Sequence, residues 1–220
     1  MDCESFKFKL PAAIQVSGPS NVGKSIFVLK LLLNAEQLIE PVPELIFYCY
    51  SIWQPNIFNL LQEKYGERIY FIHGFSELEK ISFSSEVAHC IVLDDLMYEV
   101  GSSEFAANLF TKIAHHGNIL LIFITQNIYF KAKYMPTINR NIKYNVVFRN
   151  KRFRHELELL ARQSLGIGAK NINRIMEIVA SENNYPYLIF DLQNSTPEEK
   201  SLVTNIFPDS SYPQTYFYID

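Results

Sequence analysis

The sequence contains only three cysteines, Cys3, Cys49 and Cys90, and no two of them have C-x-x-C spacing. This number and spacing argue against a disulfide framework and against a zinc site. Cys49 and Cys90 each lie within an apolar run. We therefore expect both to be buried free thiols in a protein of a reducing compartment.

Long apolar runs, internal repeats and Gly/Ser linkers are also missing. No uninterrupted apolar stretch reaches the roughly 18 residues of a membrane span. Residues 1–9 carry two acids and no apolar core, unlike a secretory signal. We expect an intracellular protein without a membrane partner. Its 220 residues, 48% of them hydrophobic, predict a single domain over residues 1–220.

Acidic residues are absent between Glu104 and Glu156, although the whole chain has a formal net charge of -3. This acid-free interval predicts either a contact with a polyanion or a solvated basic face, and charge alone does not decide between them. Its basic residues are Lys112, Lys131, Lys133, Arg140, Lys143, Arg149, Lys151, Arg152 and Arg154.

Short runs rich in apolar, β-branched and aromatic residues alternate with helical or polar segments. The expected strands are residues 13–17, 45–50, 69–73, 90–94, 119–125, 144–148, 187–191 and 215–219. The expected helices are residues 25–35, 56–65, 102–115 and 171–181. Continuous apolar runs are typical of strands covered on both faces. The alternation predicts an α/β three-layer sandwich with a mostly parallel central sheet.

One segment between an expected strand and an expected helix matches G-x-x-x-x-G-K-[ST] in full, and we call it the P-loop. Its glycines permit close approach of the backbone, and its N–H groups and the helix N-terminus are suited to bind a β-phosphate. The lysine would reach the β- and γ-phosphates of ATP, and the final serine would ligate Mg²⁺. The complete motif, with both flanking elements, argues against a chance glycine turn. The P-loop residues are Gly18, Pro19, Ser20, Asn21, Val22, Gly23, Lys24 and Ser25.

Two carboxylates, Asp94 and Asp95, follow the apolar run of the expected strand 90–94. Ligands of open α/β sheets bind at the carboxyl ends of strands, where a P-loop needs a partner acid. We assign Asp94 to a Mg²⁺-bound water and Asp95 to the water that attacks the γ-phosphate. The alternative is that the pair caps the following turn.

The run 119–124 leads into Thr125 and Gln126. A polar side chain at the end of the strand beside the acid-bearing one can contact both the γ-phosphate and the attacking water, so we predict that Gln126 is a catalytic sensor. The competing interpretation is a strand-end cap. His115 and His116 are assigned no catalytic role. The fold class predicted is a P-loop NTPase of the additional-strand, RecA-like type.

The sequence resembles the viral genome-packaging ATPases of the HerA/FtsK superfamily, in the branch shared by poxvirus-like large DNA viruses and the Maverick/Polinton and adintovirus elements. The P-loop alone is unspecific, whereas Asp-Asp-Leu-Met together with Thr-Gln-Asn is considerably more specific. The matching segments keep the family's order across nearly the whole chain: residues 16–25, 91–97, 115–118, 123–127, 145–150 and 187–192, with Thr196.

The resemblance implies a homo-oligomeric ring that hydrolyses ATP with Mg²⁺ and drives double-stranded DNA into a capsid. It implies docking on capsid vertex proteins and a location in the host cytoplasm or nucleus, or with the virion. In this family an arginine of the neighbouring subunit reaches the γ-phosphate. Arg140 and Arg149 lie in the matching region, with Arg152 as a weaker candidate.

A DNA motor gives the acid-free interval a use, since Lys131, Lys133 and Lys143 would contact DNA phosphates independently of base sequence. Trp53 is a candidate for stacking on adenine. Tyr48 and Tyr50 are weaker candidates, because core packing explains them better.

The alternative function is a small P-loop nucleoside or nucleotide kinase, with the acid-free interval as its arginine-rich lid. Paired carboxylates and a glutamine-tipped strand favour ATP hydrolysis. A GTPase is not indicated, because no Asn-Lys-x-Asp motif occurs, and no cassette-transporter signature is present.

Overall fold

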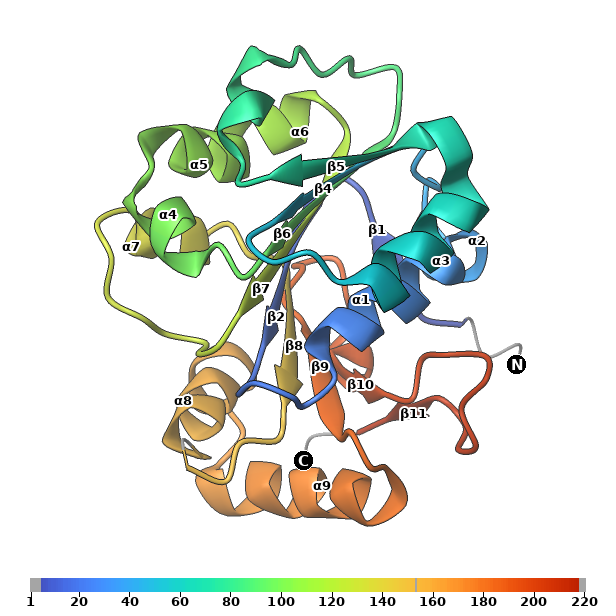
Figure 1. Ribbon diagram of the computed structural model, residues 1–220. Helices are drawn as coiled ribbons and strands as arrows, with labels where there is room; N and C mark the ends of the chain where they lie inside the picture. Colours follow the sequence, from blue (N-terminus) through green and yellow to red (C-terminus); the bar gives the residue numbers. More distant parts are fainter. Residues whose placement is uncertain (1–4, 153, 218–220) are drawn as a thin grey trace.

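The computed structural model describes residues 5–152 and 154–217. Its main feature is a nine-stranded sheet of order β11-β10-β9-β8-β2-β7-β6-β4-β5 (Figure 1). The six strands from β8 to β5 in this order are parallel. The other pairs are antiparallel: β9 with β8, β10 with β9, and β11 with β10. The bounds are β2 Ala12–Ser17, β4 Leu45–Tyr50, β5 Ile69–His73, β6 His89–Asp94, β7 Ile119–Thr125, β8 Tyr144–Phe148, β9 Tyr187–Asp191, β10 Leu202–Thr204 and β11 Thr215–Tyr216.

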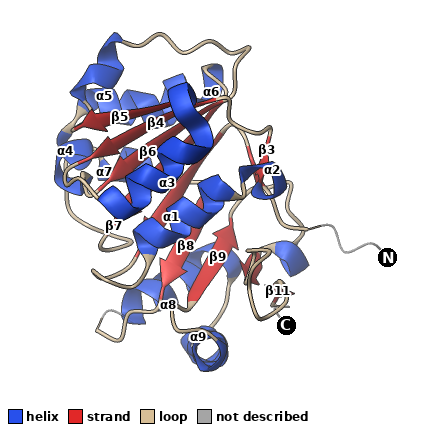
Figure 2. Ribbon diagram, turned by 45° about the vertical axis from the view of Figure 1, so that its right-hand side comes forward, coloured by secondary structure: helices blue, strands red, loops and turns tan. Residues whose placement is uncertain are grey.

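Helices cover both faces of this sheet. One face carries α1 (Lys24–Leu33), α2 (Ala35–Leu38) and α3 (Pro55–Tyr65), and Figure 2 shows α1 and α3 side by side across it. A two-stranded parallel sheet of β1 (Phe8–Lys9) and β3 (Ile39–Glu40) packs at the same face.

The opposite face carries the remaining helices. They are η2 Ser76–Lys80, α4 Met97–Ser102, α5 Glu104–Asn108, the π-helix η3 Leu109–Ile113, α6 Ala114–His116, α7 Met135–Asn139, α8 Arg154–Leu165 and α9 Ala169–Glu182; short 3-10 turns η1 (Gly66–Arg68) and η4 (Glu198–Lys200) complete the described elements. The three-layer sandwich with a mostly parallel sheet is therefore confirmed.

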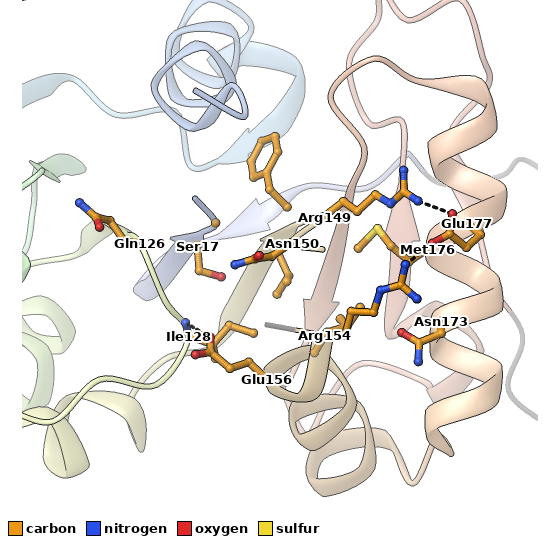
Figure 3. A pocket seen from close by; sticks show the side chains of 14 residues that line it. Ser17, Gln126, Ile128, Arg149, Asn150, Arg154, Glu156, Asn173, Met176 and Glu177 are labelled. Atoms are coloured by element: carbon orange, nitrogen blue, oxygen red, sulfur yellow. Dashed lines mark hydrogen bonds and ion pairs between the residues drawn. The ribbon is translucent and has the colours of Figure 1, made fainter. Parts of the chain in front are cut away.

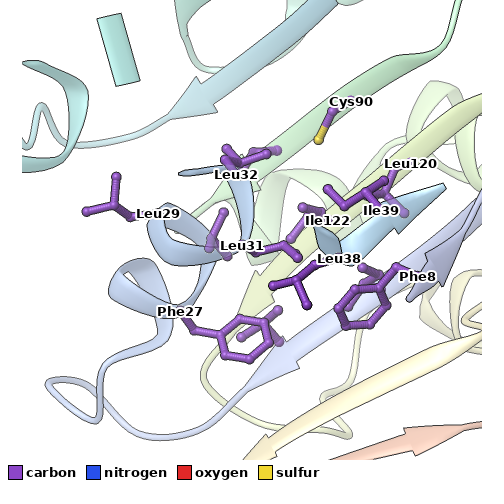
Figure 4. Packing of buried hydrophobic residues seen from close by; sticks show 14 of the residues in the cluster. Phe8, Phe27, Leu29, Leu31, Leu32, Leu38, Ile39, Cys90, Leu120 and Ile122 are labelled. Carbon is purple, nitrogen blue, oxygen red and sulfur yellow. The ribbon is translucent and has the colours of Figure 1, made fainter. Parts of the chain in front are cut away.

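The core explains why the central strands are apolar at every position. Successive side chains of a strand point to opposite faces, so a strand between two helical layers buries both. Ile14 of β2 packs toward α1, and Ala13 packs toward the other layer. Figure 4 shows Phe27, Leu31 and Ile122 among the buried side chains between α1 and the sheet.

The helical prediction differs from the structure in the bounds of two helices and in the helices that it omits. The predicted helix 102–115 is confirmed over residues 104–115, as α5, η3 and α6, but it begins later than expected because Ser103 is extended and caps α5, its Oγ accepting from the Ala106 N–H at 3.2 Å. The predicted helix 25–35 ends at Asn34, which separates α1 from α2. Helices α4, α7 and α8 were not predicted. The expected strand 215–219 extends beyond the described residues.

Cys49 and Cys90 are buried free thiols, as expected, while Cys3 lies outside the described residues. Burial raises the pKa of Cys49 to about 12, so the thiol stays protonated and unreactive. No helix within residues 5–152 and 154–217 combines the length and apolarity needed to cross a bilayer.

Candidate active site

The P-loop connects β2 to α1 at the edge where the parallel strands have their carboxyl ends. Its backbone begins beside β7, where the Gly18 N–H donates to the Thr125 carbonyl at 3.3 Å. A Cβ atom on Gly18 would lie 2.7 Å from the Phe148 Cβ, so only glycine fits there. Gly23 has φ 95° and begins α1, a conformation that a side chain would strain. The positions of both glycines thus follow from backbone geometry.

Lys24 is held across the P-loop by its own backbone. The Nζ atom donates to the carbonyls of Gly18 and Pro19, each at 2.8 Å. Burial lowers the pKa of the Lys24 ammonium, and the charges of Asp94 and Asp95 oppose that shift. The cation therefore lies over the loop, facing the two carboxylates.

Asp94 is the most strongly anchored acid of this edge, with only 3% of its surface exposed. Its Oδ2 atom accepts from the Tyr48 hydroxyl at 2.9 Å. The same oxygen accepts from Gln54 Nε2 at 3.2 Å and from Ser25 Oγ at 3.3 Å. Burial raises the pKa of Asp94, while the hydrogen bonds from Tyr48 and Ser25 lower it.

The donor set around Asp94 fits a nucleotide-bound Mg²⁺. The carboxylate and the Ser25 hydroxyl are hard oxygen ligands, and Mg²⁺ is usually held by one or two carboxylates plus substrate phosphates and waters. Across the described ranges, no group of three His, Cys, Asp or Glu side chains stands together as a metal cage. Ser25 and Asp94 would accordingly hold the ion together with a triphosphate.

Asp95 has a different environment from its neighbour. Its φ of 58° is left-handed, and its side chain is exposed, with Ser51 Oγ donating to Oδ2 at 3.3 Å. Non-glycine residues adopt this conformation rarely, and such strain concentrates at functional sites. The turn directs one carboxylate into the protein and leaves the next one open, which suits Asp94 and Asp95 to the different roles assigned above.

A cavity of about 300 Å³ brings the predicted residues together, and we call it the P-loop cavity. It lies between the P-loop and the ends of β4, β6 and β7. Its lining residues are Ser20, Asn21, Lys24, Ser25, Ser51, Ile52, Gln54, Asp94, Asp95, Ile124, Thr125 and Gln126.

Gln126 reaches this cavity because β7 lies between the P-loop strand β2 and the acid-bearing strand β6. The side chain is exposed, but the backbone around it is fixed by Gln15 of β2. Gln15 Nε2 donates to Thr125 Oγ1 at 3.2 Å and to the Ile128 carbonyl at 3.0 Å. The Ile128 N–H donates to Glu156 of α8 at 2.9 Å. Gln15 and Glu156 therefore position the loop that carries Gln126.

The two arginines predicted to act between subunits lie at opposite edges of the sheet. Arg149 follows β8, beside Gly18, and pairs with Glu177 of α9 (Figure 3). Arg154 pairs with the same carboxylate at 3.4 Å. Arg140 is exposed and precedes β8, at the amino ends of the parallel strands. Neither arginine lines the P-loop cavity of its own chain, and their action in trans stays a prediction.

The basic residues of the acid-free interval lie at different edges of the sheet, and a contact with DNA stays a prediction. Lys143 lies at the amino edge of the sheet, half-buried, and its Nζ donates to the Pro11 carbonyl at 2.7 Å. Lys131 and Lys133 are exposed in the segment that leads from β7 to α7. The chain crosses from one edge of the sheet to the other within the interval, so neighbouring charges separate in space.

Gln54 is a site residue that the sequence did not indicate, and Tyr48, a weaker candidate for stacking on adenine, packs in the core instead and contacts Asp94. Tyr48 is fully buried in β4, but its hydroxyl touches Asp94 because β4 pairs with β6. Trp53 is 48% exposed and packs edge-on against Phe58. It follows β4, on the side of Asp94 away from the P-loop, which argues against the predicted stacking on adenine.

Removing the Tyr48 hydroxyl tests the anchoring of Asp94. We expect Tyr48→Phe to raise the Mg²⁺ concentration needed for half-maximal ATP turnover by about 10-fold, because partners of a metal ligand typically change affinity by that order. Tyr65→Phe is the matched control, since its buried hydroxyl donates to the Leu32 carbonyl, outside the site. An equal Mg²⁺ requirement in both variants would contradict the anchoring role.

Comparison with known proteins supports the same assignment of fold. No protein-family model and no curated protein sequence matches this sequence. The cytoplasmic domain of the Thermomonospora curvata type VII secretion ATPase EccC aligns with a TM-score of 0.53 and 13% identity, covering 84% of this chain and 24% of that one. ATPases 2 and 3 of EssC from Geobacillus thermodenitrificans align with a TM-score of 0.43 and 15% identity, covering 63% of this chain and 32% of that one.

The fold is that of a P-loop ATPase domain. The alignment with EccC and the sheet order agree, since one strand separates the P-loop strand from the acid-bearing strand. The chain spans about a quarter of the length of the EccC chain and about a third of the length of the EssC chain.

Proposed function

We propose that this P-loop ATPase domain hydrolyses ATP in the P-loop cavity. The observation that carries the proposal is the convergence of Lys24, Ser25, Asp94, Asp95 and Gln126 on one cavity, from a loop and two strands that are far apart in the sequence. A phosphate-binding loop, an anchored carboxylate, a free carboxylate and a glutamine are the parts that ATP hydrolysis by P-loop enzymes requires.

Each of these side chains has a distinct task. Lys24 neutralises charge on the β- and γ-phosphates, and the Asp95 carboxylate accepts a proton from the attacking water. Gln126 orients that water from the other side of the cavity. Mg²⁺ held with Ser25 and Asp94 supplies charge neutralisation at the phosphate oxygens.

The finer part of the proposal is a homo-oligomeric ring that translocates double-stranded DNA and packages a viral genome into a capsid inside the host cell. It is supported by the sequence resemblance. It is also consistent with a P-loop cavity in which no described lining residue is an arginine. An arginine from a neighbouring subunit, Arg140 or Arg149, would then complete the site.

The nucleoside or nucleotide kinase remains the alternative. A kinase lid would place arginines of the acid-free interval over the phosphates, whereas Arg149 is paired with Glu177. Incubation with ATP and a panel of nucleosides and nucleotides separates the two functions. Release of inorganic phosphate is expected for the motor, and a phosphorylated acceptor would support the kinase.

DNA stimulation tests the motor. We expect double-stranded DNA to increase ATP turnover several-fold, independently of its base sequence, because backbone phosphates are the contact that a translocase needs. Raising salt from about 50 to 200 mM should remove most of this stimulation. The measurement is phosphate release with DNA of unrelated sequences, using polyglutamate as the polyanion control. Equal stimulation by polyglutamate, or none by DNA, would count against a DNA motor.

A further inference from the structure

A second cavity borders the P-loop and has a volume of about 290 Å³. Gly23 and Ile26 line it, whereas Lys24 and Ser25, between them in sequence, line the P-loop cavity. The two cavities therefore lie on different sides of the first turn of α1. We call the second one the side cavity.

Two apolar surfaces in the side cavity are open to solvent. Tyr185, in the segment between α9 and β9, is 60% exposed, and Ile26 is 47% exposed. A Cβ atom on Gly23 would lie 3.2 Å from the Tyr185 ring, so the ring packs directly on the glycine that begins α1. A flat aromatic ring is thus fixed beside the phosphate-binding backbone with most of its surface uncovered.

The side cavity also contains a buried polar group without a partner. Asn183 Nδ2 donates to the Val179 carbonyl at 3.3 Å and to Asn205 Oδ1 at 3.1 Å. These contacts fix the orientation of both amides, since the Asn205 oxygen must face a donor. Asn205 Nδ2 is left with no hydrogen-bond partner, although the residue is only 3% exposed. A buried donor of this kind is costly unless a ligand satisfies it.

We propose that the nucleobase of bound ATP occupies the side cavity, with its ring stacked on Tyr185 and its polar edge toward the amides of Asn183 and Asn205. This inference rests on the proposed function, because Lys24, Ser25 and Asp94 then fix the γ-phosphate end in the P-loop cavity. The base must lie at the other end of the nucleotide, on the far side of the first turn of α1.

Other positions around the P-loop do not suit a base. The hollow beside Gly18 and Arg149 has a volume of only about 20 Å³. Trp53 packs against Tyr50, Phe58 and Phe71 and lines neither the P-loop cavity nor the side cavity. The side cavity is lined by aromatic and aliphatic side chains together with a similar number of polar ones, and its size is near the lower end of the usual range for small-molecule sites, about 300–1,000 Å³.

The test compares two ligands that share the phosphates and differ in the base. Binding of Mg²⁺-ATP and of Mg²⁺-tripolyphosphate is measured by calorimetry on the wild type, Tyr185→Ala, Tyr185→Phe and the control Tyr98→Ala, whose exposed ring lies on α4. We expect Tyr185→Ala to weaken ATP about 5- to 100-fold, the range for one base–aromatic stack, and to leave tripolyphosphate unchanged. Tyr185→Phe keeps the ring and should bind both ligands normally, as should Tyr98→Ala.

Each other outcome has a separate meaning. Unchanged ATP affinity in Tyr185→Ala overturns the side cavity as the base site while leaving ATP hydrolysis standing. Equal weakening of ATP and tripolyphosphate would show that Tyr185 supports the P-loop, and it also overturns the inference. A wild type that binds neither ligand overturns the proposed function and this inference with it.

Discussion

Asparagine in place of Asp95 is expected to leave ATP affinity within about 2-fold of the wild type and to slow ATP hydrolysis about 10²- to 10⁴-fold. Asp95 is exposed in the P-loop cavity and contacts Ser51, so the amide fits without disturbing Asp94 or the P-loop. Asparagine also tolerates the left-handed φ of 58°. What the substitution removes is the group that accepts the proton of the attacking water. Steady-state phosphate release and calorimetric ATP binding measure the two effects separately.

The matched control for this variant is Glu99→Gln. Glu99 is an exposed carboxylate on α4, four positions along the chain, and it does not line the P-loop cavity. Its neutralisation makes the same change of charge and should leave turnover unaltered. Turnover of Asp95→Asn equal to that of Glu99→Gln would refute the role given to Asp95.

Alanine in place of Lys24 is expected to weaken ATP binding by about 10²- to 10⁴-fold and to reduce turnover at least as much. The ammonium is fixed over the P-loop by the carbonyls of Gly18 and Pro19, so it is positioned before a phosphate arrives. Charge-assisted hydrogen bonds contribute about 1.5–3 kcal/mol each, and two phosphate contacts account for the predicted loss. Calorimetry with Mg²⁺-ATP measures it.

Lys170→Ala serves as the control, because Lys170 is an exposed lysine in the first turn of α9, away from both cavities. Circular dichroism and the melting temperature of both variants establish that they fold. A folded Lys24→Ala protein with wild-type ATP affinity would contradict the role of the P-loop in ATP binding.

The central strands could be predicted because burial on both faces requires apolar residues at every position. The bounds of β4, β5, β7, β8 and β9 are those expected from the sequence, and β2 and β6 each begin one residue earlier. Continuous apolar runs of five to seven residues are typical of strands that are covered by helices on both faces.

Elements that depend on tertiary contacts could not be predicted. Helix α8 begins within the basic run and buries a narrow stripe, Leu157, Leu160 and Ala161, so little of its sequence is apolar. Strands β1 and β3 have two residues each and exist because they pair with one another. Helix α5 begins only after Ser103 because the backbone of that residue is extended, and the helical pattern in the sequence does not reveal this start.

The candidate site likewise contains residues that could be predicted from the sequence and residues that could not. The P-loop, Asp94 and Asp95 are adjacent in sequence or follow a strand, so spacing and strand ends were enough to propose them. Tyr48, Gln54 and Gln15 reach the site through the order of strands in the sheet, which brings β4 beside β6 and β2 beside β7. Only the sheet order connects these polar groups with the motifs.

The most direct measurement is mass analysis of the phosphate formed from Mg²⁺-ATP in water enriched in heavy oxygen, using the wild type and Asp95→Asn. Attack by water in the P-loop cavity predicts inorganic phosphate that carries one solvent oxygen per turnover, with the rate reduced by orders of magnitude in Asp95→Asn. Absence of labelled phosphate from the wild type, or equal labelling rates in the two proteins, would contradict hydrolysis at this site.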